Sequence, residues 1–293
     1  MKPLICIVGE TASGKSELGY KLAQSLGAEI ICADSQTIRK GFDLGTAKPN
    51  QIMQNTVRHH LIDIIEPNDN FNAAKFAAKV KEVIEDIYSR GKVPILVGGT
   101  GLYVDAVIYN YSFLPRSNQI LREELNNLSL DQLYNLILNK GYKTKNIDVH
   151  NKRRLIRIIE TKGAQPRKSK LRPNTFIIGV TLDRNDLKAR IQNRIDQMIR
   201  DGLEIEVRGL VKKFGWDIEG LKTIGYIQFK EYLEGNITID QVKLNILQAT
   251  LNLAKRQRTW FRRNKSIHWY KQPINLEDIV VLTTSFLNES HFN

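Results

Sequence analysis

The sequence is poor in cysteine and contains no long apolar run. Its two cysteines, Cys6 and Cys32, lie inside apolar segments, which argues against a disulfide framework and against a cysteine zinc site. No stretch approaches the roughly 20 apolar residues that a membrane span needs. The apolar residues 4–8 lead directly into a glycine loop, so we expect no signal peptide. These absences predict a cytoplasmic protein with no membrane association.

Acidic residues are also scarce relative to basic ones. The 293 residues include 31 Asp and Glu against 44 Lys and Arg, which gives a net charge of +13. This balance favours a polyanionic partner such as nucleic acid, although a lysine-rich composition alone would produce the same charge. A hydrophobic content of 42% is typical of a soluble globular protein.

Short apolar runs alternate with helical patterns in the first hundred residues. Residues 3–8, 28–33 and 93–97 have the continuous apolar character of strands buried on both faces of a parallel sheet, and 176–180 repeats it. A helix is predicted over 16–25, and Asn72 is the expected N-cap of another, whose apolar face is Phe76, Val80, Val83 and Ile87. The alternation predicts a doubly wound α/β sheet. After residue 180 we expect only helices.

The middle of the chain has a different character. Residues 116–170 show leucine-rich helical periodicity with many Asn and Lys and no buried-strand pattern. We interpret them as a small helical insertion domain, which leaves residues 1–115 and 171–293 as the catalytic core.

A phosphate-binding loop is the strongest local signal. Residues 9–16 read GETASGKS and fit G-x-x-x-x-G-K-[ST], with a predicted strand before and a helix after. Backbone N–H groups of such a loop surround anionic oxygens at a helix N-terminus, Lys15 adds a positive charge, and Ser16 offers a hydroxyl to Mg²⁺.

Two further polar groups follow predicted strands. Asp34 and Ser35 follow the second strand, and Gly98-Gly-Thr100-Gly101 ends the third. Ligands of open α/β sheets bind at this edge, where Asp34 could hold Mg²⁺ through water or accept a proton. Asp34 could instead cap the next segment, and the glycines could be a simple turn.

Basic residues concentrate in three places. Arg190 and Arg194 are four apart on a predicted helix, where they could clamp phosphates or form a solvated face. Residues 255–263 read KRQRTWFRR; at helical spacing Lys255, Arg256, Arg258, Arg262 and Arg263 cover one arc, and Phe261 lies on the apolar one. Gln257 falls in the apolar arc, where a buried amide would need partners. The third cluster is residues 152–157.

The adjacent His59 and His60, with Asp63, could suggest a metal site. Neighbouring His side chains point in different directions and no third ligand has a suitable spacing, so we do not predict zinc there.

Together these motifs resemble the tRNA dimethylallyltransferases, also called tRNA isopentenyltransferases, over nearly the whole chain. The matching stretches include GETASGKS, ADSQTIRKGFDLGTAKP at 33–49, PILVGGTGLYVDA at 94–106 and ATLNLAKRQRTWFRR at 249–263. The resemblance implies a P-loop NTPase-like core. It also implies transfer of a dimethylallyl group from its diphosphate to the exocyclic amine of the adenine beside the anticodon of tRNA, with Mg²⁺ as cofactor and a monomeric enzyme.

The resemblance also assigns roles to residues. It implies that Asp34 is the general base and that Lys15 and Thr100 share in catalysis. The residues implied to hold diphosphate are Gly9, Thr11, Ala12, Ser13, Gly14, Lys15, Ser16, Arg190 and Arg194, with Ser16 also on the metal. The residues implied to meet tRNA are Asp34, Ser35, Gln36, Thr37, Thr100, Arg122, Arg153, Arg154, Arg157, Lys255, Arg256, Gln257, Arg258, Trp260 and Arg262.

Three positions depart from the family pattern, which usually has Pro, Gln and Tyr where Glu10, Thr37 and Arg39 stand. Glu10 adds a negative charge near the phosphates, and Thr37 changes one expected base contact. Two alternatives remain: a P-loop small-molecule kinase with Arg190 and Arg194 as lid arginines, and a non-catalytic RNA-binding protein. The first leaves the basic C-terminal helix unexplained, and the intact Lys15, Ser16 and Asp34 argue against the second.

Overall fold

A computed structural model describes residues 1–114, 118–143, 148–164 and 166–291. Contacts divide these residues into two units, the first made of 1–108 and 171–293, the second of 109–170. The predicted start of the insertion, residue 116, lies outside the described residues.

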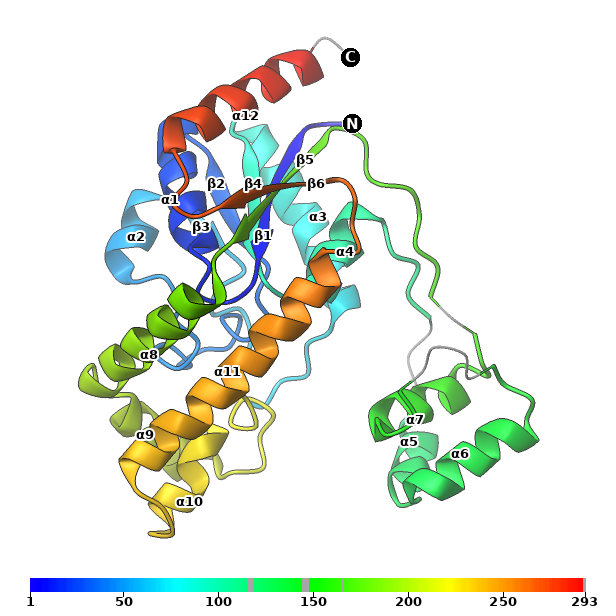
Figure 1. Ribbon diagram of the computed structural model, residues 1–293. Coiled ribbons are helices and arrows are strands. Elements are labelled where there is room, and N and C mark those ends of the chain that lie inside the picture. The colour runs from blue at the N-terminus through cyan, green and yellow to red at the C-terminus, as the bar shows by residue number, and fades with distance from the viewer. Residues whose placement is uncertain (115–117, 144–147, 165, 292–293) are drawn as a thin grey trace. The chain divides into compact units, whose positions relative to one another are not determined.

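The first unit is built on a six-stranded parallel sheet in the order β3-β2-β4-β1-β5-β6 (Figure 1). The strands are β1 (Leu4–Gly9), β2 (Glu29–Cys32), β3 (His59–His60), β4 (Pro94–Gly98), β5 (Thr175–Thr181) and β6 (Ile267–Lys271). β1 pairs with both β4 and β5, and β4 also pairs with β2. The carboxyl ends of β1, β2 and β4 therefore meet at one edge.

Helices cover the sheet because its central strands are apolar on both sides. In β1, Ile5 and Ile7 pack with residues of α1 (Lys15–Leu26) and of α12 (Leu276–His291), including Leu22 and Ile279. The alternate residues of β1 are buried as well and point to the other face. α3 (Ala73–Ser89) packs against β2 and β4, and the Asn72 side chain accepts from two backbone N–H groups, as its predicted role of N-cap requires.

A second apolar core joins the helices of the C-terminal half. It includes buried residues of α8 (Arg184–Arg200), α9 (Leu203–Phe214) and α11 (Ile239–Phe261). Figure 1 shows these helices gathered at one end of the sheet, with α11 reaching up to it. The remaining elements of this unit are α2 (Gln51–Thr56), α4 (Gly101–Ile108), the 3₁₀ turn η1 (Ile227–Phe229) and α10 (Lys230–Leu233).

The four predicted strands are present, but the expectation of helices alone after residue 180 is wrong. β6 pairs with β5 at the sheet's edge, where only Ile267 of its residues is fully buried. An edge strand of this kind carries no continuous apolar run. β3 has two residues, which is too short for any periodicity to reveal.

The second unit contains the helices α5 (Gln119–Asn126), α6 (Leu130–Asn139) and α7 (Lys152–Glu160). Their leucines and isoleucines form a separate core, which includes Leu133, Ile137, Leu155 and Ile159. Among the described residues of the whole chain, no helix combines the length and the apolar character needed to cross a membrane.

Candidate active site

The glycine loop between β1 and α1 has the backbone geometry of an anion cradle. Ala12 and Gly14 both have positive φ, 61° and 95°, a backbone conformation that is typical of loops whose N–H groups surround an anion. Any Cβ on Gly14 would be strained at that φ and would lie 2.6 Å from Gln272 Nε2. The Ser13 hydroxyl is buried and has no hydrogen-bond partner among the described residues. The loop therefore presents one unsatisfied buried hydroxyl, which could donate a hydrogen bond to an anionic ligand.

Lys15 is held at the same loop without a carboxylate partner in the part of the chain that the structure describes. Its Nζ donates to the backbone carbonyl of Glu10 at 3.2 Å. Burial lowers the pKa of Lys15 from 10.5 to about 8; the negative charge of Asp34 opposes this shift, and the positive charge of Arg194 adds to it. A buried ammonium group without a strong ion pair is suited to bind a negatively charged ligand.

The ends of β2 and β4 bring Asp34 and Thr100 together, as the sequence predicts for two neighbouring parallel strands. The Thr100 hydroxyl accepts from Ser35 N–H at 3.1 Å, which leaves its own proton free to donate to a ligand. Asp34 Oδ1 accepts from Gln36 N–H at 2.8 Å. The capping role considered for Asp34 is thus real, but the same side chain also faces a cavity.

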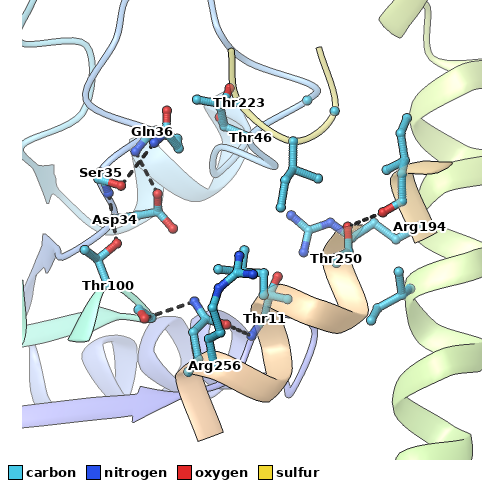
Figure 2. A pocket seen from close by; sticks show the side chains of 18 of the residues that line it. Thr11, Asp34, Ser35, Gln36, Thr46, Thr100, Arg194, Thr223, Thr250 and Arg256 are labelled. Atoms are coloured by element: carbon cyan, nitrogen blue, oxygen red, sulfur yellow. Dashed lines mark hydrogen bonds between the residues drawn. The ribbon is translucent and has the colours of Figure 1, made fainter. Parts of the chain in front are cut away.

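That central cavity has a volume of about 470 Å³, within the range of small-molecule sites. Its polar lining includes Thr11, Asp34, Gln36, Thr100, Arg194 and Arg256, and its apolar lining includes Ile191, Ile195, Met198, Ile224, Ile246 and Leu253. Figure 2 shows the side chains of Asp34 and Arg194 pointing toward each other across it. The cavity thus joins a charged end beside the loop to an apolar wall.

The two arginines of α8 occupy different places. Arg194 lines the cavity, and burial lowers its pKa while the negative charge of Asp34 opposes that shift. Arg190 is exposed and lies beside the loop, where its Nη1 would be 3.3 Å from a Cβ on Gly14. The predicted pair therefore flanks the loop, with only Arg194 inside the cavity.

The end of α11 is hydrogen-bonded to the edge of the sheet where β1 and β4 end. Gln257 accepts from Thr11 N–H at 2.7 Å and donates to the Gly99 carbonyl at 2.9 Å, so its half-buried amide has the partners that it requires. Trp260 packs on Gly101, where a Cβ would lie 2.4 Å from the indole. The helix thus holds the loop after β1 and the turn after β4 at once.

Arg258 departs from the predicted exposed arc of α11. Its Nε and Nη2 donate to the two carboxylate oxygens of Glu10, each at 2.6 Å. Lys255, Arg256 and Arg262 are exposed as the arc requires, and Phe261 is buried on the opposite side. The prediction of a free cation at position 258 is therefore wrong, because helical periodicity cannot reveal a carboxylate 248 residues earlier.

The arginines predicted to meet tRNA from the second unit lie on α5 and α7. Arg122 and Arg157 pair with the buried carboxylate of Glu160, at 3.7 and 3.3 Å, whereas Arg153 and Arg154 are exposed. Their contact with tRNA remains a prediction.

Neither the pairing of Glu10 with Arg258 nor several lining residues of the cavity can be identified from the sequence alone. Thr46, Thr223 and Thr250 line it although nothing in their spacing marks them. His60 Nε2 donates to the carboxylate of the buried Glu29, 2.7 Å away, at the opposite end of β2 from Asp34.

A glycine loop that joins a buried strand to a helix, at the carboxyl edge of a parallel sheet, defines a P-loop protein of the α/β class. The family model of the IPP transferases matches residues 37–264. The tRNA dimethylallyltransferase of Anoxybacillus flavithermus is 38% identical over 278 residues, which cover 91% of this chain and 89% of that protein. That of Bacillus subtilis is 37% identical over 293 residues, covering 94% and 93%.

Solved structures agree with this result. The full-length tRNA isopentenylpyrophosphate transferase from Bacillus halodurans has a TM-score of 0.77 and 33% identity, covering 99% of this chain and 98% of that one. A eukaryotic dimethylallyltransferase acting on tRNA has a TM-score of 0.83 at 20% identity, covering 99% and 80%, which shows a shared fold. The chain belongs to the IPP transferase family of tRNA prenyl-transferring enzymes. The predicted fold class and family are confirmed.

Proposed function

We propose that this enzyme transfers a dimethylallyl group from dimethylallyl diphosphate to the exocyclic amine of the adenine beside the anticodon of tRNA. The observation that carries the proposal is the central cavity, where Thr11 of the glycine loop and the carboxylate of Asp34 face an apolar wall. The loop and Lys15 bind the diphosphate, and the apolar wall accommodates the prenyl chain. The adenine must leave its stack to reach Asp34.

In the proposed reaction, the adenine nitrogen forms a bond to the allylic carbon while the bond from that carbon to the diphosphate oxygen breaks. The amine loses a proton, which Asp34 accepts. Pyrophosphate leaves with the bonding electrons, and its developing charge is stabilised by Lys15, Arg194 and the loop N–H groups. Thr100 donates its free hydroxyl proton to a substrate oxygen or nitrogen and so orients the reactants.

Mg²⁺ fits the same site, because the Ser16 hydroxyl lies at the start of α1, directly after the cradle. We propose that Ser16 and the diphosphate oxygens hold it. When bound, the ion supplies positive charge that neutralises the departing pyrophosphate. We propose that the enzyme acts as a monomer in the cytoplasm, the compartment of its proposed tRNA substrate.

Two parallel incubations test this function against its alternatives. The protein is mixed with radiolabelled dimethylallyl diphosphate and bulk tRNA, and in parallel with ATP and small metabolites. We expect label in the tRNA fraction. Conversion of ATP to ADP without transfer of label would instead support a kinase, which no comparison favours, and binding of tRNA without either reaction would support an RNA-binding protein.

We expect the exposed cations of α11 to contact tRNA phosphates. Replacing Lys255 and Arg262 together by Ala should weaken tRNA binding and reduce the slope of log affinity against log salt by about 2. The slope falls because each phosphate contact that is lost means that about one counterion fewer is released on binding. The melting temperature should hardly change, since exposed charges contribute little to stability. Salt-titrated binding and thermal melts measure both quantities.

Lys81 on α3 and Lys212 on α9 provide the matched control, since both are exposed lysines on other helices. Their double replacement by Ala removes the same charge but should leave the salt slope unchanged within about half a unit. An equal loss of slope in both double variants would mean that net charge, and not the surface of α11, binds tRNA.

Binding of diphosphate should weaken above pH 8. The pKa of Lys15 in the free protein is lowered to about 8 by burial, so the ammonium group is present below that pH and lost above it. Because diphosphate binds the charged form, its affinity should be flat with respect to Lys15 below pH 8. Above it, affinity should fall by up to about tenfold per pH unit. Calorimetric titration with pyrophosphate on either side of pH 8 measures this dependence.

The Lys15→Arg variant controls for titration of pyrophosphate itself, because a guanidinium keeps its charge throughout this range. The difference between the two pH profiles isolates Lys15. Identical profiles would show that Lys15 does not titrate near pH 8 in the free protein.

A further inference from the structure

Glu10 is the one carboxylate among residues 9–16 of the glycine loop. Its negative charge opposes the binding of an anionic diphosphate there. Its side chain is 2% exposed, and its own backbone carbonyl accepts the Lys15 ammonium group at 3.2 Å. A buried carboxylate without a partner attracts any cation within reach, because nothing else compensates the loss of its hydration. The nearest cation along the loop is Lys15.

Arg258 removes this conflict. Its guanidinium forms two parallel hydrogen bonds of 2.6 Å to the Glu10 carboxylate, the strongest geometry available to such a pair. The Arg258 side chain is only 17% exposed, so a tRNA phosphate would have to compete with a buried carboxylate for it. The two charges cancel, and the pair adds no net charge to the loop.

The pair is one of several hydrogen-bonded contacts that fix the position of α11 relative to the loop. Gln257 of α11 holds Thr11 N–H at 2.7 Å, and the next residue, Arg258, holds Glu10, the residue before Thr11. Two successive helix residues thus fix two successive loop residues. Because Gln257 also donates to the Gly99 carbonyl, α11 holds the turn that carries Thr100 in place as well.

We propose that Arg258 is a positioning residue of the diphosphate site: it holds the Glu10 carboxylate away from Lys15, so that the lysine remains available to the diphosphate. This inference rests on the proposed function of the loop, and it assigns Arg258 to the loop instead of to tRNA. Lys15 and the loop N–H groups touch the ligand, whereas Arg258 acts on it only through Glu10.

Calorimetry that measures the binding of inorganic pyrophosphate and Mg²⁺ to the full chain tests the proposal without needing prenyl transfer. Arg258→Leu should bind pyrophosphate about 10–100-fold more weakly, because the released Glu10 carboxylate pairs with Lys15. In the double variant Glu10→Gln with Arg258→Leu there is no carboxylate to release, so affinity should return to within about threefold of wild type. Affinity for tRNA should stay unchanged in both.

Two results would overturn the proposal. The first is a double variant as weak as Arg258→Leu, since the loss would then not depend on Glu10. The second is a loss of tRNA affinity in Arg258→Leu with pyrophosphate binding intact, which would make Arg258 a tRNA contact.

Arg258→Leu buries an unpaired carboxylate and could fail to fold, so Glu10→Gln alone provides a second test. It keeps Arg258 and removes the charge that opposes the ligand, and we expect pyrophosphate to bind at least as tightly as to wild type. A tenfold or greater weakening in this variant would show that the Glu10 charge itself supports binding, contrary to the proposal. If wild type binds no pyrophosphate at all, the proposed function of the loop fails instead.

Discussion

Asp34→Asn should lower kcat for prenyl transfer by about 10²–10⁴-fold, the usual contribution of a general base. The amide has nearly the same shape, and its oxygen can still accept from Gln36 N–H, so the turn after β2 should be preserved. It cannot take the proton that the adenine amine loses. Single-turnover kinetics with saturating tRNA and dimethylallyl diphosphate measures the loss in the chemical step.

Binding of tRNA and of pyrophosphate to Asp34→Asn should remain close to wild type, which separates a chemical role from a contact role. Asp34→Glu is the matched variant, because it retains a carboxylate but displaces it; we expect intermediate activity. If Asp34→Asn turns over at nearly the wild-type rate and only its KM for tRNA rises, Asp34 is a turn cap and a tRNA contact, and the base lies elsewhere.

Lys15→Met should lower kcat/KM for dimethylallyl diphosphate by about 10²–10³-fold, the effect of removing one charged group that stabilises a developing anion. The ammonium group of Lys15 is held inside the loop by a hydrogen bond to the Glu10 carbonyl. Methionine fills a similar volume without charge, so the loss should appear in pyrophosphate binding as well as in the rate. Steady-state kinetics and calorimetry on the same preparation measure both.

The ligand-free Lys15→Met protein should be no less stable than wild type at pH 7. Burial lowers the pKa of Lys15 to about 8 in the folded protein, so its charge is unfavourable to folding below pH 8, and this cost is relieved between pH 8 and the unfolded value of 10.5. A variant that melts early would mean that activity is lost through unfolding. Full activity in a stable variant would remove Lys15 from the mechanism.

Much of the core could be predicted because the signals are local. Continuous apolar runs identify β1, β2, β4 and β5, since a strand covered on both faces needs apolar side chains at every position. The same argument places Asp34 and Thr100 at one edge once the strands are parallel, and the structure brings both to the central cavity. The cap Asn72 and three buried residues of α3, Phe76, Val80 and Ile87, were equally visible, although Ile84 is buried where Val83 was predicted.

What could not be predicted depends on contacts between distant segments. β6 is an exposed edge strand, so neither length nor apolar character marks it. The pair formed by Glu10 and Arg258 joins residues 248 apart, and helical periodicity placed Arg258 on a solvated arc. Arg190 and Arg194 lie one turn apart on the same side of α8, yet only Arg194 lines the cavity, whereas Arg190 lies beside Gly14 of the loop. Such facts require the tertiary fold.

The most direct measurement of the central claim uses two tRNA transcripts that differ only at the purine beside the anticodon, one with adenine and one with hypoxanthine, which lacks the exocyclic amine. Each is incubated with the enzyme, Mg²⁺ and radiolabelled dimethylallyl diphosphate, and incorporated label and released pyrophosphate are counted. The proposed reaction predicts one pyrophosphate per label incorporated into the adenine transcript and no label in the hypoxanthine transcript. Equal labelling of both transcripts, or pyrophosphate release without labelling of either, would contradict it.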